Sequence, residues 1–207
     1  MRLYDSNIPS GNVYKVQLLL AQLGMAYETS VLDILAPQPE TRRPEYLAKN
    51  PNGRVPALEL DDGRVLAESN AILCYLAEGT PLEAADRYDR AHTLQWLFFE
   101  QYSHEPYIAV LKFWSFWGGL EQLRTEEVER LRTRGQQALD VMETHLHTRK
   151  FFVAERYGIA DIALFAYTQS AVAIGFSVGP SVGAWLERVR SQPGFVPIKR
   201  DPLSKAP

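Results

Sequence analysis

The polar residues that could do chemistry lie in three short segments, each where a strand-like pattern ends and a helix or turn begins. The first is Ser10-Gly11-Asn12, directly ahead of a helical pattern. Ser and Asn are common N-cap residues, so simple capping explains this segment as well as a functional role does. A helix N-terminus also carries free N–H groups and a partial positive charge, and beside a serine hydroxyl it can hold an anion.

The second segment, residues 50–56, is a turn with Pro56 directly before a strand. Proline has no N–H to donate to a sheet, so it belongs at the start or edge of a strand. A cis Val55–Pro56 bond would turn the N–H and C=O of Val55 outward, where they could pair with an extended peptide. Cis bonds are uncommon even before proline, and the sequence alone leaves both isomers open.

The third segment is Glu68-Ser69-Asn70-Ala71-Ile72, at the start of another helix. Capping by Ser69 is one explanation, and a binding role is equally good. The Ser69 hydroxyl and the helix N–H groups suit a carboxylate, and Glu68 suits an ammonium group. Together the three segments predict a site for a small extended peptide with an α-amino acid head, a backbone-paired middle and an anionic sulfur or oxygen near Ser10.

The elements around these segments follow the order strand, helix, strand, helix, hairpin and helix. Apolar residues recur with the helical period after Ser10, and Gly24 is the expected end of that helix. Residues 27–32 have a strand pattern. Residues 55–60 and 64–66 flank a turn containing Asp-Gly, which is typical of a hairpin.

Beyond a linker at residues 80–85 the pattern is helical throughout. The most apolar stretch, residues 159–176, is interrupted by polar residues and is too short for a membrane span, so we expect a buried helix there. We therefore predict an α/β domain over residues 1–79 and an all-helical domain over residues 86–207.

Composition excludes several other classes of protein. The 207 residues are 46% hydrophobic and 23% charged, as in a folded soluble protein. A net charge of −3 argues against non-specific binding of nucleic acid. The single cysteine, Cys74, cannot form an internal disulfide, and the N-terminus lacks a secretory pattern, so we expect a cytoplasmic protein that does not span a membrane.

Other catalytic motifs are missing from the sequence. His145 and His147 are two residues apart and do not share a helix face, and there is no HExxH, so we expect no metal. There is no GxGxxG, no P-loop and no GxSxG around Ser10.

On the three segments together, the sequence resembles the cytosolic glutathione transferases. It is most similar to their bacterial serine/threonine type, whose first helix begins [S/T]-x-N-x-x-K-V, here residues 10–16. Residues 50–56 and 68–72 and the late motif ending in Ile159-Ala160-Asp161 also match. The resemblance covers nearly the whole chain in the expected order and spacing.

The resemblance implies a thioredoxin-like N-terminal domain with a cis Pro56, an all-helical C-terminal domain and a homodimer. It implies that Ser10 hydrogen-bonds the glutathione sulfur, with Asn12 nearby as a second catalytic residue. One departure concerns folding, because the family usually has Ser or Thr where this chain has Gly158, three residues before Asp161. We expect a slightly weaker helix cap there.

The resemblance also places the remaining contacts with glutathione. Val55 would pair with the cysteinyl backbone, and Glu68 and Ser69 would hold the γ-glutamyl head. Arg54 stands where the family often has a basic residue near the tripeptide. Arg42 is the nearest candidate for the glycine carboxylate.

Thiol ionisation alone gives limited catalysis. A drop of about two units in the thiol pKa raises the thiolate fraction at neutral pH about 25-fold, but the lower nucleophilicity removes about 6- to 10-fold of this gain. Most of the acceleration must come from holding the electrophile against the sulfur. We expect Tyr107 and Trp114, on the aromatic-rich first long helix of the second domain, to line its hydrophobic pocket.

These features predict a glutathione transferase that conjugates the thiolate of glutathione, its co-substrate, to small hydrophobic electrophiles. Two alternatives stay open. One is a glutathione-dependent disulfide or peroxide reductase on the same site, and the other is a non-enzymatic dimer that binds glutathione or hydrophobic ligands. Cys74 lies in mid-helix, where a structural thiol is the expected role.

Overall fold

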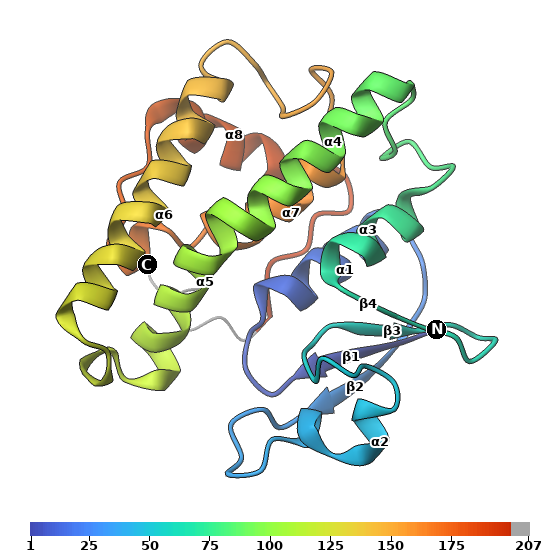
Figure 1. Cartoon of the computed structure of the whole chain (residues 1–207). Helices are drawn as coiled ribbons and strands as arrows, with labels where there is room; N and C mark the ends of the chain where they lie inside the picture. Colours follow the sequence, from blue (N-terminus) through green and yellow to red (C-terminus); the bar gives the residue numbers. More distant parts are fainter. Residues whose placement is uncertain (200–207) are drawn as a thin grey trace. The chain divides into compact units, whose positions relative to one another are not determined.

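The chain begins with a parallel β-α-β unit in the computed structural model, which describes residues 1–199 (Figure 1). Strands β1 (Arg2–Ser6) and β2 (Glu28–Leu32) pair in parallel, and helix α1 (Gly11–Gln22) connects them. Parallel neighbours need such a crossover connection, so this order follows from the predicted strand, helix and strand.

Helix α1 has a clear stop signal at its C-terminus. Gly24 adopts a φ of 63°, its N–H donates to the Ala21 carbonyl at 3.2 Å, and the Met25 N–H donates to the Leu20 carbonyl at 2.9 Å. This pair of bonds is a Schellman motif, which favours glycine at the left-handed position. The predicted end of the helix at Gly24 is confirmed.

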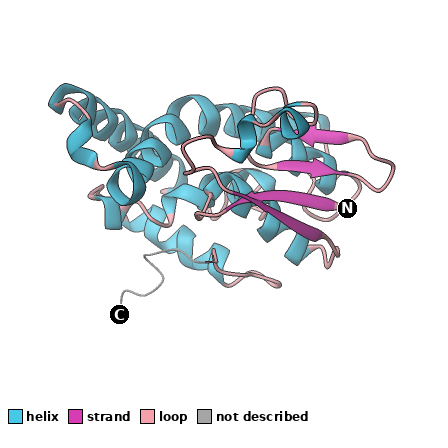
Figure 2. Ribbon diagram, turned by 90° about the horizontal axis from the view of Figure 1, so that it is seen from below, coloured by secondary structure: helices cyan, strands magenta, loops and turns pink. Residues whose placement is uncertain are grey.

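Two short antiparallel strands complete the sheet, whose order is β2-β1-β3-β4. Strand β3 (Ala57–Glu59) pairs with β1, and β4 (Val65–Ala67) pairs with β3. Figure 2 shows these strands gathered in one sheet. The hairpin predicted around the Asp-Gly turn is confirmed.

The two faces of the sheet bury different side chains. Leu3 and Leu58 lie opposite each other and are fully buried. The next pair, Tyr4 and Ala57, points to the other face, where the Tyr46 ring packs at 5.4 Å from the Tyr4 ring. Figure 1 shows α1 and α3 on one side of the sheet and α2 on the other. The remaining helical elements before residue 80 are η1 (Glu40–Arg42), α2 (Pro44–Leu47) and α3 (Ser69–Ala77).

A second compact unit, residues 81–192, is helical. Its α-helices are α4 (Arg87–Phe99), α5 (Glu105–Phe113), α6 (Thr125–Leu146), α7 (Ile159–Thr168) and α8 (Pro180–Arg190). Short helical segments lie between them: η2 (Glu100–His104), η3 (Trp114–Gly118), η4 (Leu120–Gln122) and η5 (Val172–Ile174). The predicted fold class, an α/β thioredoxin-like unit followed by an all-α unit, is confirmed.

Helix α7 forms the centre of the second unit, because every one of its residues is buried. The buried helix predicted in the apolar stretch 159–176 is therefore confirmed, although the α-helix itself ends at Thr168.

The start of α7 is held by the carboxylate of Asp161. Its oxygens accept hydrogen bonds from the Gly158 N–H at 3.0 Å, the Phe152 N–H at 3.2 Å and the Trp185 indole N–H at 2.8 Å. Gly158 has no side chain to return a bond, and the Asp161 N–H donates to the Gly158 carbonyl at 3.1 Å instead. As expected, one of the two bonds of a capping box is missing, because glycine has no side chain to accept the Asp161 N–H. The backbone carbonyl of Gly158 accepts it in its place.

Residues 193–199 belong to the first unit rather than to the helical one. The Tyr14 hydroxyl on α1 donates to the Val196 carbonyl at 2.8 Å. This return differs from the expected helical domain of residues 86–207, whose last residues, 200–207, lie outside the described part of the chain.

Within residues 1–199, no helix has both the length and the apolar character that a membrane crossing requires.

Candidate functional site

The strand register brings the three polar segments to one edge of the sheet. Ser10 and Asn12 follow the C-terminal end of β1. Because Tyr4 pairs with Ala57, the residue before β3, Pro56, lies at that same end. Ala57 in turn pairs with Ala67, so the segment after β4 begins there as well. Segments more than forty residues apart in sequence therefore meet beside the start of α1.

Ser10 is the N-cap of α1 and is half-buried. Its Oγ accepts the Val13 N–H at 3.3 Å, which is long for a bond of this type. Within the described residues the structure gives its hydroxyl hydrogen no acceptor. The capping role is thus present, and the O–H remains available as a donor to a bound anion.

Asn12 contacts Ser69, so two of the predicted site residues from different segments are brought together. The Ser69 hydroxyl lies 3.3 Å from Asn12 Oδ1. The ammonium of Lys15 lies between them, at 2.8 Å from Asn12 Oδ1 and 3.3 Å from Ser69 Oγ. Lys15 is fully buried, and Ser69 is 4% exposed.

The Val55–Pro56 bond is cis, as the resemblance implied. Across residues 1–199 the structure gives the Val55 backbone N–H and C=O no hydrogen-bond partner. The Val55 side chain packs against the cluster formed by Tyr4, Tyr46 and Ala57. The side chain is anchored, and the backbone is available to pair with an extended ligand.

The Arg54 backbone is held firmly while its side chain is exposed. The Arg54 carbonyl accepts the Tyr46 hydroxyl at 2.6 Å and the Asn50 amide at 2.7 Å. Burial raises the pKa of Tyr46 to about 12, so this phenol stays protonated and keeps donating. Asn50 and Tyr46 therefore fix the backbone immediately before Val55.

Glu68 has a φ of 66°, which is uncommon for a residue other than glycine. Residues in such conformations cost about 1–3 kcal/mol and cluster at binding and active sites. The Glu68 carboxylate is exposed, its contact to the Asn52 amide is long at 3.5 Å, and within the described chain no cation pairs with it. The Arg42 guanidinium donates to the backbone carbonyl of Asn52 at 3.1 Å.

Tyr107 and Trp114 make different described contacts in the helical unit. Tyr107 borders a cavity of about 320 Å³ together with Phe99, Tyr102 and Val141. Trp114 instead packs edge to face with Phe113, at a ring distance of 5.7 Å. That both residues line one pocket for a hydrophobic substrate stays a prediction.

Cys74 lies within α3 and is partly buried. Burial raises the pKa of its thiol, which disfavours the reactive thiolate. The observation supports a structural thiol at this position.

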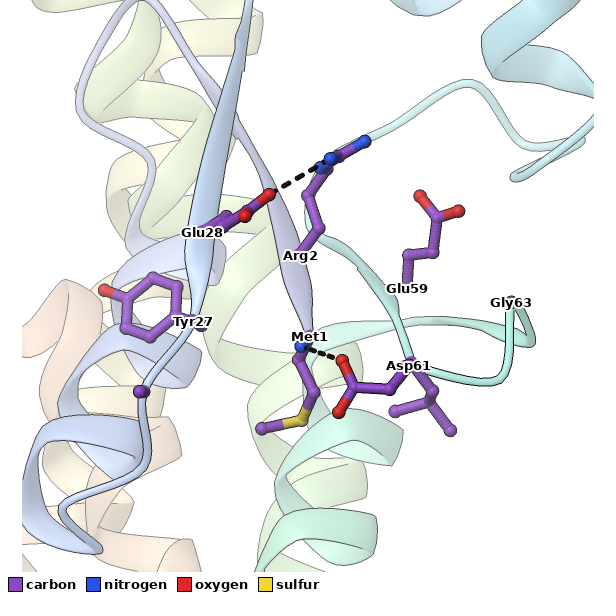
Figure 3. Close-up of a pocket in the computed structure, with 9 residues that line it drawn as sticks. Met1, Arg2, Tyr27, Glu28, Glu59, Asp61 and Gly63 are labelled. Atoms are coloured by element: carbon purple, nitrogen blue, oxygen red, sulfur yellow. Dashed lines mark hydrogen bonds and ion pairs between the residues drawn. The ribbon is translucent and has the colours of Figure 1, made fainter.

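A larger cavity of about 460 Å³ lies at the other end of the strands, away from Ser10 and Pro56 (Figure 3). It is bordered by Met1, Glu59 and Asp61; the Met1 ammonium pairs with Asp61, and Arg2 pairs with Glu28 at 3.0 Å. Since Glu59 is at the end of β3 that lies away from Pro56, this cavity is separate from the candidate site.

Among residues 1–199 there is no cluster of three or more His, Cys, Asp or Glu side chains able to hold a metal ion.

Sequence reasoning missed Lys15 and Asn52 as members of the site. Lys15 carried a usable signal, because it lies three residues after Asn12 on the same helix face. Asn52 carried none beyond its place in the turn, since its contact with Glu68 spans 16 residues.

The described residues combine a thioredoxin-like α/β unit with an all-helical unit, which is the architecture of the glutathione S-transferase class. The sequence matches "Glutathione S-transferase, N-terminal domain" over residues 9–78 and "Glutathione S-transferase, C-terminal domain" over residues 88–193. The chain belongs to the glutathione S-transferase family.

Three relatives illustrate the range of this similarity. A glutathione S-transferase from Pseudomonas fluorescens Pf-5 has a crystal structure with a TM-score of 0.90 and 48% identity, covering 95% of this chain and 97% of that one. A disulfide-bond oxidoreductase of Escherichia coli K12 is 31% identical over 194 residues, 89% of this chain and 88% of that protein. A Pseudomonas putida glutathione transferase, solved with one glutathione disulfide per subunit, has a TM-score of 0.79 and 29% identity, covering 93% and 87%.

Proposed function

We propose that this protein is a glutathione transferase of the serine/threonine type, which adds the glutathione thiolate to small hydrophobic electrophiles. The observation that carries the proposal is the shared sheet edge, where Ser10, Val55 and Glu68 offer a hydroxyl donor, an unpaired backbone and a carboxylate. These three groups suit, in order, the sulfur, the peptide middle and the α-ammonium of glutathione. Glutathione disulfide bound to the Pseudomonas putida relative supports a ligand of this type.

In this mechanism the Ser10 hydroxyl donates to the sulfur, and the N-terminus of α1 adds its positive potential. The Val55 N–H and C=O pair with the cysteinyl backbone, and Glu68 and the start of α3 hold the γ-glutamyl head. Arg54 and Arg42 are placed for the glycine end. The first unit, residues 1–80 with the returning C-terminal segment, is the proposed glutathione-binding part.

The electrophile then needs an apolar surface, because its orientation against the sulfur supplies most of the acceleration. Trp114 with Phe113 and Trp117 forms an aromatic cluster with ring distances of 5.7 and 6.5 Å, and this cluster is the proposed contact for the electrophile. Tyr107, on the wall of the neighbouring cavity, is the second candidate.

The Ser10→Ala variant tests the role of the hydroxyl. A hydrogen bond to a charged group contributes about 1.5–3 kcal/mol, so its loss should raise the pKa of the bound thiol by about one to two units. The stronger intrinsic nucleophilicity of the less acidic thiolate offsets about half of this effect. Turnover of a chloronitrobenzene at neutral pH should fall between about threefold and tenfold, with glutathione affinity changed less than about twofold.

The Ser10→Thr variant keeps a hydroxyl and is the matched control, with turnover close to wild type. Calorimetry gives the affinity, and thermal unfolding of both variants separates the loss of the helix cap from the loss of turnover. Unchanged turnover in Ser10→Ala would remove Ser10 from this role.

A glutathione-dependent disulfide reductase is the second candidate, because the Escherichia coli relative is a disulfide-bond oxidoreductase. Since no CxxC is present and the pKa of Cys74 is raised, the sulfur of glutathione would be the nucleophile. Parallel assays with a chloronitrobenzene, 2-hydroxyethyl disulfide and cumene hydroperoxide distinguish transfer from reduction. Tight glutathione binding without turnover of any of the three would instead indicate a binding module.

We also propose that the protein is a cytoplasmic homodimer. Leu94, Phe98 and Tyr102 follow the i, i+4, i+8 spacing and are 44%, 69% and 83% exposed. Val141 on α6 is 47% exposed and borders the same cavity as Tyr102. Such an apolar helix face is typical of an interface, and a twofold dimer would pair it with itself.

The Phe98→Glu variant should be largely monomeric, because a dimer would bring two carboxylates into an apolar contact. Sedimentation at micromolar protein measures this directly. Val172→Glu, at a residue 67% exposed on η5, is the control and should sediment like wild type. A Phe98→Glu protein that sediments like wild type would place the interface elsewhere.

A further inference from the structure

A cluster of rings in the helical unit joins α4 to the end of α6 and to the connection that follows it, residues 147–158. The Trp96 ring lies 4.5 Å from the His145 ring and 4.7 Å from the Phe152 ring. His92, one turn earlier on α4, lies 6.1 Å from the His145 ring. Because Trp96 is only 5% exposed, its indole N–H needs a hydrogen-bond partner within the protein.

That partner is His92, and the bond defines the protonation of this imidazole. The Trp96 Nε1–H donates to His92 Nε2 at 3.1 Å. An indole nitrogen can only donate, so His92 Nε2 carries a lone pair and the neutral ring has its proton on Nδ1. A protonated His92 has a donor at both nitrogens and cannot accept this bond.

His145 has the opposite tautomer. Its Nε2 lies 3.0 Å from the Phe152 carbonyl oxygen, and since a carbonyl can only accept, this nitrogen carries a proton. The His145 and Phe152 rings are stacked at 5.4 Å, with 5° between their planes. Burial lowers the pKa of His145, so this ring is uncharged at neutral pH. Two neutral imidazoles thus hold the Trp96 indole and the Phe152 backbone.

The charges around the two rings affect them differently. Arg149 and the His92 ring disfavour a charge on His145, and Glu155 favours one. Asp89, three residues before His92, favours a charge on that ring. These charges direct a proton to the His92 side of the pair. The other charged or titratable groups that the described residues place near the pair or Phe152 are Tyr88 on α4, Arg156 on the connection and Asp161 on α7.

We infer that His92 and His145 form an acid-sensitive latch in the helical unit. While both rings are neutral, they hold Trp96 against Phe152. A proton on His92 removes the only acceptor that the described residues offer to the Trp96 indole, and the loss of this bond loosens the connection from α6 to α7.

The direction of the pH dependence follows from the neutral forms. Because the pKa of His145 is lowered, its contribution to stability is complete above about pH 6.5 and is lost as the pH falls further. The bond from Trp96 to His92 is likewise present only while His92 is neutral. The test therefore spans pH 8 to pH 5, on both sides of the ordinary imidazole pKa of about 6.5.

The test follows hydrogen exchange at the Trp96 indole N–H in the full chain, with each rate divided by the intrinsic rate at that pH. Trp96→Phe assigns the indole resonance among those of the four tryptophans. In wild type the protection should be at least about fivefold lower at pH 5 than at pH 8, because the buried donor has lost its acceptor. The Leu164 amide, in the fully buried helix α7, should keep its protection.

His92→Gln is the decisive variant, because its amide oxygen can accept the indole N–H and binds no proton in this range. Its indole protection should change by less than about twofold between pH 8 and pH 5. At pH 5 the Arg156 amide, which donates to the Val153 carbonyl at 3.0 Å, should exchange more slowly in His92→Gln than in wild type.

Two further variants are controls. His145→Gln keeps a donor for the Phe152 carbonyl and retains His92, so it should show most of the wild-type loss of indole protection. His147→Gln replaces an exposed histidine and should behave like wild type.

Three outcomes would overturn the inference. Equal indole protection at pH 8 and pH 5 in wild type would do so without any variant. An equal loss in wild type and His92→Gln would show that the proton acts elsewhere. A loss at Leu164 as large as that at Trp96 would show unfolding of the whole helical unit in place of a local release.

Discussion

Replacing Asp161 with alanine should lower the free energy of unfolding by about 3–5 kcal/mol, the largest loss that we expect from a single side chain. The Asp161 carboxylate accepts three N–H groups, from Gly158, Phe152 and Trp185, at 3.0, 3.2 and 2.8 Å. Asp161 is 1% exposed, so water cannot replace the lost acceptor. Each orphaned donor costs about 1–3 kcal/mol, partly relieved by relaxation. Urea unfolding at a fixed protomer concentration and at about pH 8, where Asp161 is ionised in the folded and the unfolded state, measures the change.

The Asp161→Asn variant separates the charge from the acceptor. Its oxygen can replace Oδ1, which accepts from Phe152 and Trp185, but its NH2 group then faces the Gly158 N–H. We expect a loss of about 1–3 kcal/mol, smaller than for alanine. Asp140→Ala, at an exposed carboxylate of α6, is the control and should change the free energy of unfolding by less than about 0.5 kcal/mol. An alanine variant at Asp161 as stable as this control would contradict the prediction.

The pH dependence of Asp161 gives an independent test. Burial raises the pKa of its carboxyl from 3.8 to about 7, against the lowering effect of the bonds from Trp185, Phe152 and Gly158. The folded state therefore binds a proton that the unfolded state releases between these two values. The stability from this linkage is complete below about pH 4 and is lost as the pH rises through about 7. The advantage of wild type over Asp161→Asn should shrink from about pH 4 to about pH 8.

Local sequence signals predicted most elements of the first unit because those elements are set by neighbouring residues. The end of α1 followed from Gly24, and the hairpin followed from its Asp-Gly turn. The ends of the strands were predicted less accurately than the ends of the helix and the turn. The predicted run 55–60 contracts to Ala57–Glu59, since Pro56 has no N–H for the sheet.

Two features depended on contacts between distant residues and could not be predicted. Residues 193–199 return to the first unit, where the Tyr14 hydroxyl donates to the Val196 carbonyl across 182 residues. Helix α1 is also buried on more than one face, and Lys15, which a single apolar stripe would leave in water, lies inside. The types of residue in the candidate site could be predicted from the sequence, whereas their proximity became clear only from the strand register.

The Glu68→Gly variant should be more stable than wild type and should bind glutathione more weakly. Glu68 has a φ of 66° and a ψ of 114°, a conformation that costs a side chain about 1–3 kcal/mol. Glycine avoids this penalty but loses about 0.5–1 kcal/mol through its more flexible unfolded chain, leaving a net gain of about 1 kcal/mol. Removing the carboxylate from the ligand ammonium costs about 1.5–3 kcal/mol, or roughly 10- to 150-fold in Kd.

The Glu68→Gln variant separates these two effects, because it keeps the strained side chain and removes only the charge. Its free energy of unfolding should stay within about 0.5 kcal/mol of wild type, while its affinity for glutathione falls. Calorimetry and urea unfolding on all three proteins give both quantities. Wild-type affinity in Glu68→Gly would refute the ammonium contact. If Glu68→Gly is no more stable than Glu68→Gln, the side chain at position 68 does not strain the backbone. The φ of Glu68 is then not maintained for the sake of the ligand.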